Sequence, residues 1–386
     1  MESLVEEWVG INTHYSNLLG LETMTRSLIK AFKPLGGEIS EEPLGPRHTL
    51  DAQGRPTTTP LGKLLSIRKH RNAPVSVLLV GHMDTVFSPT SPFQHAKRRG
   101  IRMEGPGVID LKAGLAILLV ALEALERSPY ANKLNWEVLI NPDEEIGSVG
   151  SGSLLMAHAQ ECHIGLVFEP LLPDGAHVSA RKGSATYSIC AHGRSAHAGR
   201  DHAKGKNAIV ALIRILTEIH GLQETFPEAL INIGTIKGGE APNIVPDLAV
   251  AQINVRGNSS EQATAIKHQI QRIVSETSHK QNISSVSFYE NSARAPKPFD
   301  TPTKQLFSGI KECAELLGMP MFWHETGGVC DGNNLAAVGL PTIDTMGAEG
   351  GNIHTEQEFL LLESLTRRAR LTALVLMQIA EGRISI

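Results

Sequence analysis

Short apolar runs alternate with segments of helical spacing along the first part of the chain. The spacing of apolar residues predicts helices over 21–32 and 112–125. Compact apolar runs at 75–80, 138–140 and 164–168 are typical of buried strands, and a turn-forming or acidic residue follows each of them. This alternation predicts an α/β fold with a mixed, mostly parallel sheet flanked by helices on both faces.

The pattern changes at about residue 182 and changes back after residue 293. In between, the candidates follow the order strand, helix, strand, strand, helix, strand, which is the order of a ferredoxin-like α+β sandwich. The strands are expected at 186–191, 231–236, 248–255 and 286–289, and the helices at 207–220 and 261–275. Afterwards a helix, a strand and a helix are expected at 303–317, 342–345 and 361–381. We therefore expect a main domain formed by 1–181 and 294–386, with residues 182–293 inserted as a second domain.

The composition limits the partners that the chain is expected to bind and the compartment in which it is expected to act. The chain has 386 residues and a formal net charge of −4, so it has no overall positive field to attract nucleic acid or anionic lipid. No apolar stretch reaches the roughly 20 residues that cross a bilayer. The N-terminus is acidic where a secretory signal is basic, and the four cysteines form no CxxC pair. We expect a cytoplasmic protein with no membrane contact, no disulfide framework and no thiolate zinc site.

Ionisable side chains follow the predicted buried strands. His82 and Asp84 come just after the run at 75–80, where open α/β sheets bind ligands. A metal-bound histidine usually donates its second ring N–H to a carboxylate, and Asp84 lies two positions along the chain on the same side. Taken alone, this segment is explained as well by a surface turn.

Asp110 lies in a glycine-containing turn at the entrance to the predicted helix 112–125. Helix capping is one interpretation, because aspartate oxygens accept hydrogen bonds from the unpaired first N–H groups of a helix. The other is a carboxylate that bridges two cations through its separate oxygens. The turn lacks the third glycine of a dinucleotide-binding fingerprint, so a dinucleotide enzyme is only a distant alternative.

Three consecutive acids, Asp143, Glu144 and Glu145, follow the predicted strand at 138–140. They repel one another, which is costly near a sheet end without a cation, although an acidic solvated loop is the alternative. Adjacent side chains diverge, so we assign Glu145 as a metal ligand and Glu144 as the general base. A metal can bring the pKa of a bound water to about 7, within reach of such a base.

Glu169 follows the predicted strand at 164–168, and the resumed α/β pattern would return His354 to the same sheet. Each of the two, taken alone, is explained by an ordinary loop residue or a structural histidine. Together, however, the scattered carboxylates and imidazoles favour metal-assisted hydrolysis, because a divalent cation compensates the burial of several such groups at once.

Several sequence motifs, taken together and in this order along the chain, resemble those of a known family. GHMDTVF, GPGVIDLKAG, NPDEEIGS, VFEP, SAHAG and NIHTEQE together resemble the M20 metallopeptidase family over nearly the whole chain. That family includes glutamate carboxypeptidases of the carboxypeptidase G2 type, aminoacylases, acetylornithine deacetylase and succinyl-diaminopimelate desuccinylase. The segments DEEIGS and INIGTIKGG are most similar to the carboxypeptidase G2 branch.

The resemblance implies two zinc ions per chain, in sites that could also accept cobalt or manganese. By motif position, Asp84 would support a ligand and Glu144 would be the catalytic base. The implied ligands are the bridging Asp110, with His82 and Glu169 at one ion and Glu145 and His354 at the other.

The resemblance also implies that the inserted domain is a lid and a dimerisation domain. His197 would stabilise the negative charge that develops on the scissile carbonyl, from its own or the partner subunit. Asn243 matches a substrate-contacting asparagine. Arg294 lies near the place of an arginine that binds the substrate's free carboxylate, although a solvated arginine is equally consistent. Cys330 departs from the family pattern, because its glycine-rich turn commonly carries a hydroxyl residue.

We therefore expect a metal-dependent hydrolase that cleaves an amide bond of an N-acyl amino acid or of the C-terminal residue of a small peptide, as glutamate carboxypeptidases do. A deacetylase or desuccinylase of the acetylornithine deacetylase type is the nearest alternative. A metal-containing binding protein without catalysis is less favoured, since Glu144, Glu145 and His197 are all present. The expected partners are a small-molecule substrate and a second copy of the chain.

Overall fold

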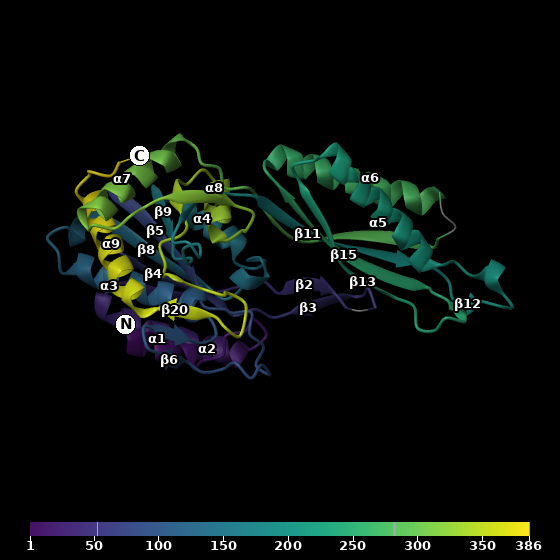
Figure 1. Ribbon diagram of the computed structural model, residues 1–386, viewed down its shortest axis with the longest axis horizontal. Helices are drawn as coiled ribbons and strands as arrows, with labels where there is room; N and C mark the ends of the chain where they lie inside the picture. Colours follow the sequence, from purple (N-terminus) through teal and green to yellow (C-terminus); the bar gives the residue numbers. More distant parts are fainter. Residues whose placement is uncertain (52, 281–282, 386) are drawn as a thin grey trace. The chain divides into compact units, whose positions relative to one another are not determined.

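The structure is a computed structural model that describes residues 1–51, 53–280 and 283–385. Its internal contacts divide the chain into two compact units, which Figure 1 shows as ribbons. Unit 1 comprises 1–46, 60–181 and 297–386, and unit 2 comprises 47–59 and 182–296. Residues 47–59, which the sequence analysis placed in the main domain, group with the inserted part instead.

A mixed sheet forms the centre of unit 1. Its strands lie in the order β1 (Glu38–Pro43), β4 (Lys63–Lys69), β8 (Leu134–Asn141), β5 (Val75–His82), β9 (Ile164–Val167) and β18 (Thr342–Ile343). β8, β5, β9 and β18 are parallel neighbours, while β4 is antiparallel to both β1 and β8. The predicted mixed, mostly parallel sheet is therefore confirmed, but the edge strand β1 and its neighbour β4 were not foreseen.

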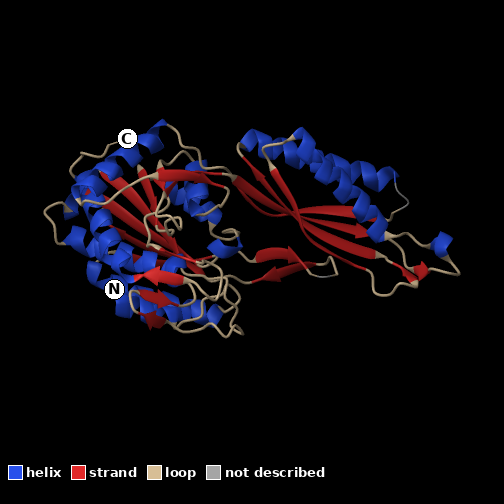
Figure 2. Cartoon of the chain, in the orientation of Figure 1, coloured by secondary structure: helices blue, strands red, loops and turns tan. Residues whose placement is uncertain are grey.

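Helices cover both faces of this sheet (Figures 1 and 2). Successive residues of β5 point to opposite faces: Val77 and Leu79 belong to one core, and Leu78 and Val80 to the other. The first core includes residues of α1 (Glu2–Val9), α2 (Leu18–Phe32), α3 (Ala113–Glu126), α7 (Thr301–Leu316) and α9 (Leu362–Ala380). The second includes residues of α4 (Gly152–Ala159) and α8 (Asp331–Ala337). Burial on both faces explains why the central strands read as continuous apolar runs.

Two small sheets bring distant segments of unit 1 together. One has the order β19 (Gly350–Gly351), β20 (Phe359–Leu361), β7 (Arg102–Glu104) and β6 (Lys97–Arg99). The other pairs β10 (His177–Arg181) with β17 (Trp323–Thr326). The first sheet places the loop that contains His354 beside the segment that leads into the Asp110 turn, about 250 residues earlier in sequence.

Unit 2 has an antiparallel sheet in the order β13 (Leu230–Gly238), β15 (Leu248–Gly257), β11 (Gly183–His192) and β16 (Ser285–Arg294). Apolar residues of α5 (Ala208–Thr225) and α6 (Ser260–Lys280) form its core together with the sheet. The chain order matches the predicted α+β sandwich. A hairpin of β2 (Arg47–Leu50) and β3 (Pro56–Thr59) joins this unit, because Gly54 lies against Cys190 and Leu248 so closely that a Cβ would collide with the Cys190 sulfur.

Across the described ranges, no helix has both the length and the apolar character that crossing a bilayer demands.

Candidate metal centre

Three neighbouring parallel strands end at the same edge of the central sheet, and each leads into a candidate residue. His82 is the last residue of β5, and its register partner on β8 is Asn141. Asp143 follows the end of β8 by two residues and begins the acidic segment 143–145, and Glu169 likewise follows the end of β9 by two residues. Since the carboxyl ends of parallel strands meet at one edge, side chains from remote parts of the sequence come together there.

Asp110 lies at the centre of this group, and its two carboxylate oxygens face different partners. Oδ1 lies 3.1 Å from His82 Nε2, and Oδ2 lies 3.3 Å from His354 Nε2. Glu169 Oε1 is 3.8 Å from His82 Nε2, whereas Glu145 Oε2 is 3.1 Å from His354 Nε2. The five predicted ligands therefore lie in two sets that share Asp110.

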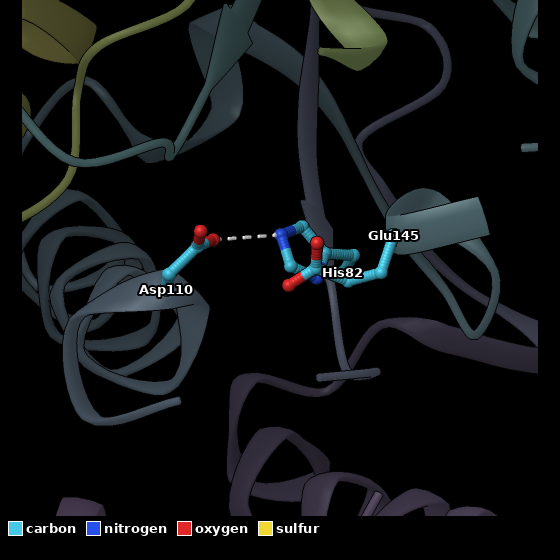
Figure 3. A group of neighbouring side chains, drawn as sticks. All are labelled: His82, Asp110 and Glu145. Carbon is cyan, nitrogen blue, oxygen red and sulfur yellow. Dashed lines mark hydrogen bonds and ion pairs between the residues drawn. The ribbon is translucent and has the colours of Figure 1, made fainter. Parts of the chain in front are cut away.

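Figure 3 shows the compact part of the cluster, where the carboxylate of Asp110 points at the ring of His82 beside Glu145. One ligand atom from each of these three residues lies within 4.8 Å of the other two. His354 is the most open member, with 48% of its side chain exposed, so the cluster is accessible to solvent on that side. His354 also has a positive φ of 64°, an uncommon conformation for a residue other than glycine and one that clusters at functional sites.

The capping interpretation of Asp110 is not observed. Helix α3 begins at Ala113, its N-cap residue is Lys112, and no side chain caps it. Asp110 instead lies in the preceding turn, Val108–Lys112, with non-helical φ and ψ of −117° and 85°. Its carboxylate is therefore engaged by the two histidines rather than by the helix.

The polar groups of this cluster fit divalent cations. Glu145 Oε1 and Glu169 Oε1 are buried and have no hydrogen-bond partner among the residues that the structure describes. Burial and the nearby Asp110 charge raise the pKa of Glu145 to about 8 and the pKa of Glu169 well above its usual value. Carboxylates that burial penalises so strongly are compensated by a bound cation, and a mixed imidazole and carboxylate donor set suits zinc and other first-row divalent ions.

The pKa values of the two histidines are also raised, but by hydrogen bonds rather than by burial. Burial alone would lower the pKa of His82, but hydrogen bonds with Asp110 and Asp84 raise it well above the usual value. Hydrogen bonds with Asp110 and Glu145 raise the pKa of His354 to about 11. Protons on these rings neutralise the carboxylates, and a cation with the same neighbours would displace those protons.

Asp84 has a wider role than supporting His82. His82 Nδ1 lies 3.1 Å from the backbone carbonyl oxygen of Asp84 and 3.4 Å from its Oδ1. The fully buried carboxylate also accepts hydrogen bonds from the backbone N–H groups of Glu144, at 3.1 Å, and Glu145, at 2.9 Å. One side chain thus orients the histidine and holds the acidic segment in place.

The three consecutive acids have three different environments. Asp143 turns into the following loop and accepts hydrogen bonds from Ser151 Oγ, at 2.5 Å, and from the backbone N–H of Gly150, at 2.7 Å. Burial raises the pKa of Asp143 to about 6. Glu144 is buried, and Glu145 reaches His354. The repulsion expected from the sequence is thus relieved by divergence as well as by charge pairing.

Glu358 is a site residue that sequence reasoning missed. Its buried carboxylate accepts hydrogen bonds from the backbone N–H groups of Gly107, Ile109 and Asp110, at 3.2, 3.0 and 3.2 Å. Burial, opposed by these hydrogen bonds, raises the pKa of Glu358 to about 7. In sequence Glu358 is one of two glutamates close after His354, and nothing in the pattern separates it from the exposed Glu356.

The structure explains how Cys330 can occupy a glycine-rich turn that commonly carries a hydroxyl residue. The Cys330 Sγ accepts a hydrogen bond from the Gly332 N–H at 3.3 Å and caps α8, which is the role a hydroxyl would have. Asp331 accepts hydrogen bonds from Asn141 Nδ2, at 2.9 Å, and Ser148 Oγ, at 2.5 Å. The turn is therefore tied to both ends of the acidic segment, and Cys330 acts as a buried helix cap.

The remaining three candidates belong to unit 2. His197 is exposed on β12 (Ala196–His197), which pairs with β14 (Ile244–Val245). Its Nδ1 accepts hydrogen bonds from the backbone N–H groups of Gly199, at 3.1 Å, and Arg200, at 3.2 Å, so the proton of the neutral ring lies on Nε2. Asn243 lies beside it, since its carbonyl oxygen accepts a hydrogen bond from Ala198 N–H at 2.9 Å.

Arg294 is the last residue of β16 and pairs in register with Ser184 on β11. It is buried within unit 2, with 8% of its surface exposed. The structure therefore brings His197 and Asn243 together and places Arg294 at the end of a different strand of the same unit.

A mostly parallel α/β sheet with imidazoles and carboxylates converging at its strand ends defines a metal-dependent hydrolase. The model of the peptidase family M20/M25/M40 matches residues 78–378, and the chain belongs to this family. Carboxypeptidase G2 of Pseudomonas sp. (strain RS-16) is 26% identical over 320 residues, which are 80% of this chain and 75% of that protein.

Solved structures with the same fold cover nearly the whole chain. The aminopeptidase PepT from Bacillus cereus ATCC 10987 has a TM-score of 0.74 at 23% identity, over 98% of each chain. YxeP from Bacillus subtilis, a dinuclear metal-binding peptidase of the M20 family, has a TM-score of 0.68 at 16% identity, over 98% of this chain and 97% of that one. At these identities the likeness shows the fold alone.

Proposed function

We propose that the chain is a dinuclear zinc hydrolase that removes the C-terminal residue of a small peptide, or the acyl group of an N-acyl amino acid, in the manner of a glutamate carboxypeptidase. The division of the Asp110 carboxylate between two histidine–glutamate pairs is the observation that carries the proposal. The similarity to carboxypeptidase G2 favours this activity over a deacetylase or desuccinylase of the acetylornithine deacetylase type.

The proposed ligand set has two halves that meet at Asp110. His82 and Glu169 would hold one ion, and Glu145 and His354 the other, in keeping with the distances at Oδ1 and Oδ2. When bound, a pair of zinc ions supplies Lewis acidity for the scissile carbonyl and lowers the pKa of a water molecule. Cobalt or manganese could replace zinc in such a site.

Glu144 is the proposed general base. It takes a proton from the attacking water at its carboxylate and later delivers this proton to the nitrogen of the leaving amine, which balances the hydrolysis of an amide bond. Its neighbour Glu145 is assigned to the metal, and Asp84 holds the backbone of both residues. That assignment would keep Glu144 next in the chain to a metal ligand without making it a ligand itself.

The inserted unit would supply the groups that bind the substrate. His197 Nε2–H, held as a donor by the two hydrogen bonds at Nδ1, would stabilise the charge that develops on the carbonyl oxygen. Asn243 would contact the substrate, and Arg294 would bind its free carboxylate through a bidentate guanidinium. In this proposal unit 2 acts as a lid over the metal site during turnover.

We further propose that the protein is a cytoplasmic homodimer assembled through unit 2. In support, β13 is an edge strand of its sheet and exposes Leu230 and Ile236, while α5 exposes Val210 and Ile213. An edge strand beside exposed apolar side chains is suited to pairing with a second copy.

A hydrolysis screen tests the proposal. The zinc-loaded protein is incubated with peptides that end in glutamate and with N-acetyl and N-succinyl amino acids, and the released amine is measured. Release of C-terminal glutamate faster than deacylation of N-acetylornithine is expected. The reverse order would favour the deacetylase alternative, and a fully loaded protein inactive on every compound would overturn the hydrolase proposal.

A further inference from the structure

A cavity of about 440 Å³ lies in unit 1. It is lined by the loop after β9, by the segment that follows α7 and by the first half of α9, and none of the proposed metal ligands or catalytic residues lines it. Its volume is within the range of small-molecule sites, roughly 300–1,000 Å³. The hydrolase mechanism makes no use of this cavity.

Two consecutive arginines of α9 line the cavity. The buried Arg368 donates hydrogen bonds from Nε to the carbonyl oxygen of Gly347, at 2.9 Å, and from Nη2 to that of Thr345, at 2.7 Å. Its Nη1 lies 3.2 Å from His177 Nε2. A guanidinium has five N–H donors, so these contacts fix its plane and leave two N–H groups for another acceptor.

Arg367 is also only partly satisfied. Its Nη2 lies 2.6 Å from Glu349 Oε2, which also belongs to the cavity wall. Its Nε, in contrast, is buried and has no hydrogen-bond partner within the described part of the chain. An unsatisfied buried donor on a charged group is costly, so a shift of this side chain toward an anion in the cavity would be favourable.

The charges around the two guanidiniums do not balance. Glu349 pairs with Arg367, and the neutral ring of His177 faces Arg368, because burial and the Arg368 charge hold the pKa of His177 well below its usual value. Asp174, on another part of the wall, is paired with His324. Arg370 and Glu363 also line this part of the cavity, which we call its arginine end. Its three arginines against two glutamates leave one positive charge in excess, which favours an anionic ligand.

The loop after β9 and the segment after α7 contribute apolar side chains to the wall. Leu171, Leu317, Met319 and Phe322 line it, and Phe322 is 41% exposed. An exposed apolar surface beside a guanidinium pair fits a ligand with an anionic head and an apolar tail.

We propose that this cavity binds a small organic carboxylate, whose carboxylate pairs with Arg367 and Arg368 and whose apolar end covers Leu317 and Phe322. The carboxylate is preferred to a phosphate because an excess of one positive charge matches a monoanion, and because the same wall presents the apolar Leu317 and Phe322. The proposal stands on the cavity alone and is independent of which substrate the metal site hydrolyses.

Calorimetric titration of the metal-loaded protein with 4-methylpentanoate, acetate and inorganic phosphate tests the proposal. Carboxylates also bind metal centres, so the cavity is identified by substitution. Arg367→Leu removes the partly satisfied guanidinium, and Phe322→Glu adds a repelling charge at an exposed wall position that folding tolerates. Arg26→Leu is the matched control, since Arg26 is an exposed helical arginine paired with Glu22 outside the cavity.

The wild-type protein and Arg26→Leu should bind 4-methylpentanoate through a site that Arg367→Leu and Phe322→Glu each weaken at least about tenfold, the usual effect of losing a charge-assisted pair. This site should bind 4-methylpentanoate at least about fivefold more tightly than acetate, because the apolar tail buries surface. Unchanged binding in both cavity variants would overturn the proposal, and so would a site that takes phosphate but not 4-methylpentanoate.

Discussion

The carboxylate of Glu358 accepts a hydrogen bond from the backbone N–H of Asp110, the residue shared by both halves of the candidate metal centre. It also holds the N–H groups of Gly107 and Ile109, so one side chain fixes the turn that aims the Asp110 carboxylate. Positioning groups of this kind govern how well a ligand is presented to a metal.

Substitution of Glu358 should therefore act through metal binding. Glu358→Ala is expected to weaken metal affinity about 10- to 100-fold and to lower turnover in proportion. Glu358→Gln should lose less, because its amide oxygen still accepts hydrogen bonds from the turn. Metal retained after dialysis against a chelator gives the affinity. Glu356→Ala, an exposed neighbour, should match the wild type, and normal metal retention in Glu358→Ala would refute the positioning role.

Glu144 and Glu145 are adjacent, but substitutions of the two residues should have different effects on turnover and on metal content. Glu144→Gln removes the proposed base, so turnover should fall about 10²- to 10⁴-fold while the metal content stays at that of the wild type. Glu145→Gln removes a proposed ligand that contacts His354 and should lower the bound metal. Elemental analysis beside initial-rate measurements separates the two, and full activity in Glu144→Gln would exclude it as the base.

The convergence of the proposed ligands could be predicted from sequence, because strand patterns mark where the chain reaches the sheet edge. His82 and Glu169 follow short apolar runs that are typical of buried strands. The parallel pairing of these strands then brings the two side chains together at one edge of the sheet. Asp143, Glu144 and Glu145 were located in the same way, whereas His354, the second histidine partner of Asp110, was assigned to the metal site from the family resemblance.

Asp84 was predicted to support His82, but the role of Glu358 and the contacts of Asp84 with the acidic segment could not be predicted, because these partners are backbone atoms whose places depend on the complete fold. Glu358 is set apart from Glu356 only by three N–H groups of a turn about 250 residues away in sequence. Strand β1 was missed because it is an exposed edge rich in glutamate with no apolar period. The hairpin 47–59 joins unit 2 through a contact of Gly54 with Cys190, which no local pattern records.

Stability should depend on pH through His158, outside the candidate metal centre. A hydrogen bond with Glu137, stronger than the opposing effect of burial, raises the pKa of His158. A histidine whose pKa is higher in the folded state stabilises the protein fully below its unfolded pKa, roughly 6.5, and loses that contribution as pH rises through the folded value. Urea unfolding at a series of pH values should show this loss above about pH 6.5, and His158→Gln should reduce it. Parallel curves for the two proteins would contradict the assignment.

His197 should affect catalysis without affecting the metal. Because its Nε2–H is proposed to donate to the developing oxyanion, His197→Ala should lower kcat about 10²- to 10³-fold and leave the metal content unchanged. His202→Ala is a suitable control, since His202 lies five residues away in the same unit and has no assigned role. A loss confined to KM would indicate ground-state binding instead and would argue against stabilisation of the oxyanion.

The proposed dimerisation through unit 2 predicts that a charge on the edge strand β13 will disrupt the dimer. Ile236 is 55% exposed there, so Ile236→Asp should not disturb the core of the unit, but it would place a charge on the surface proposed to pair with a second copy. Light scattering after size-exclusion chromatography should show a dimer for the wild type and a monomer for this variant. Ile101→Asp controls for a new charge at an exposed isoleucine, because Ile101 lies in unit 1 and is 75% exposed. A wild-type monomer, or an Ile236→Asp protein that remains dimeric, would remove β13 from the interface.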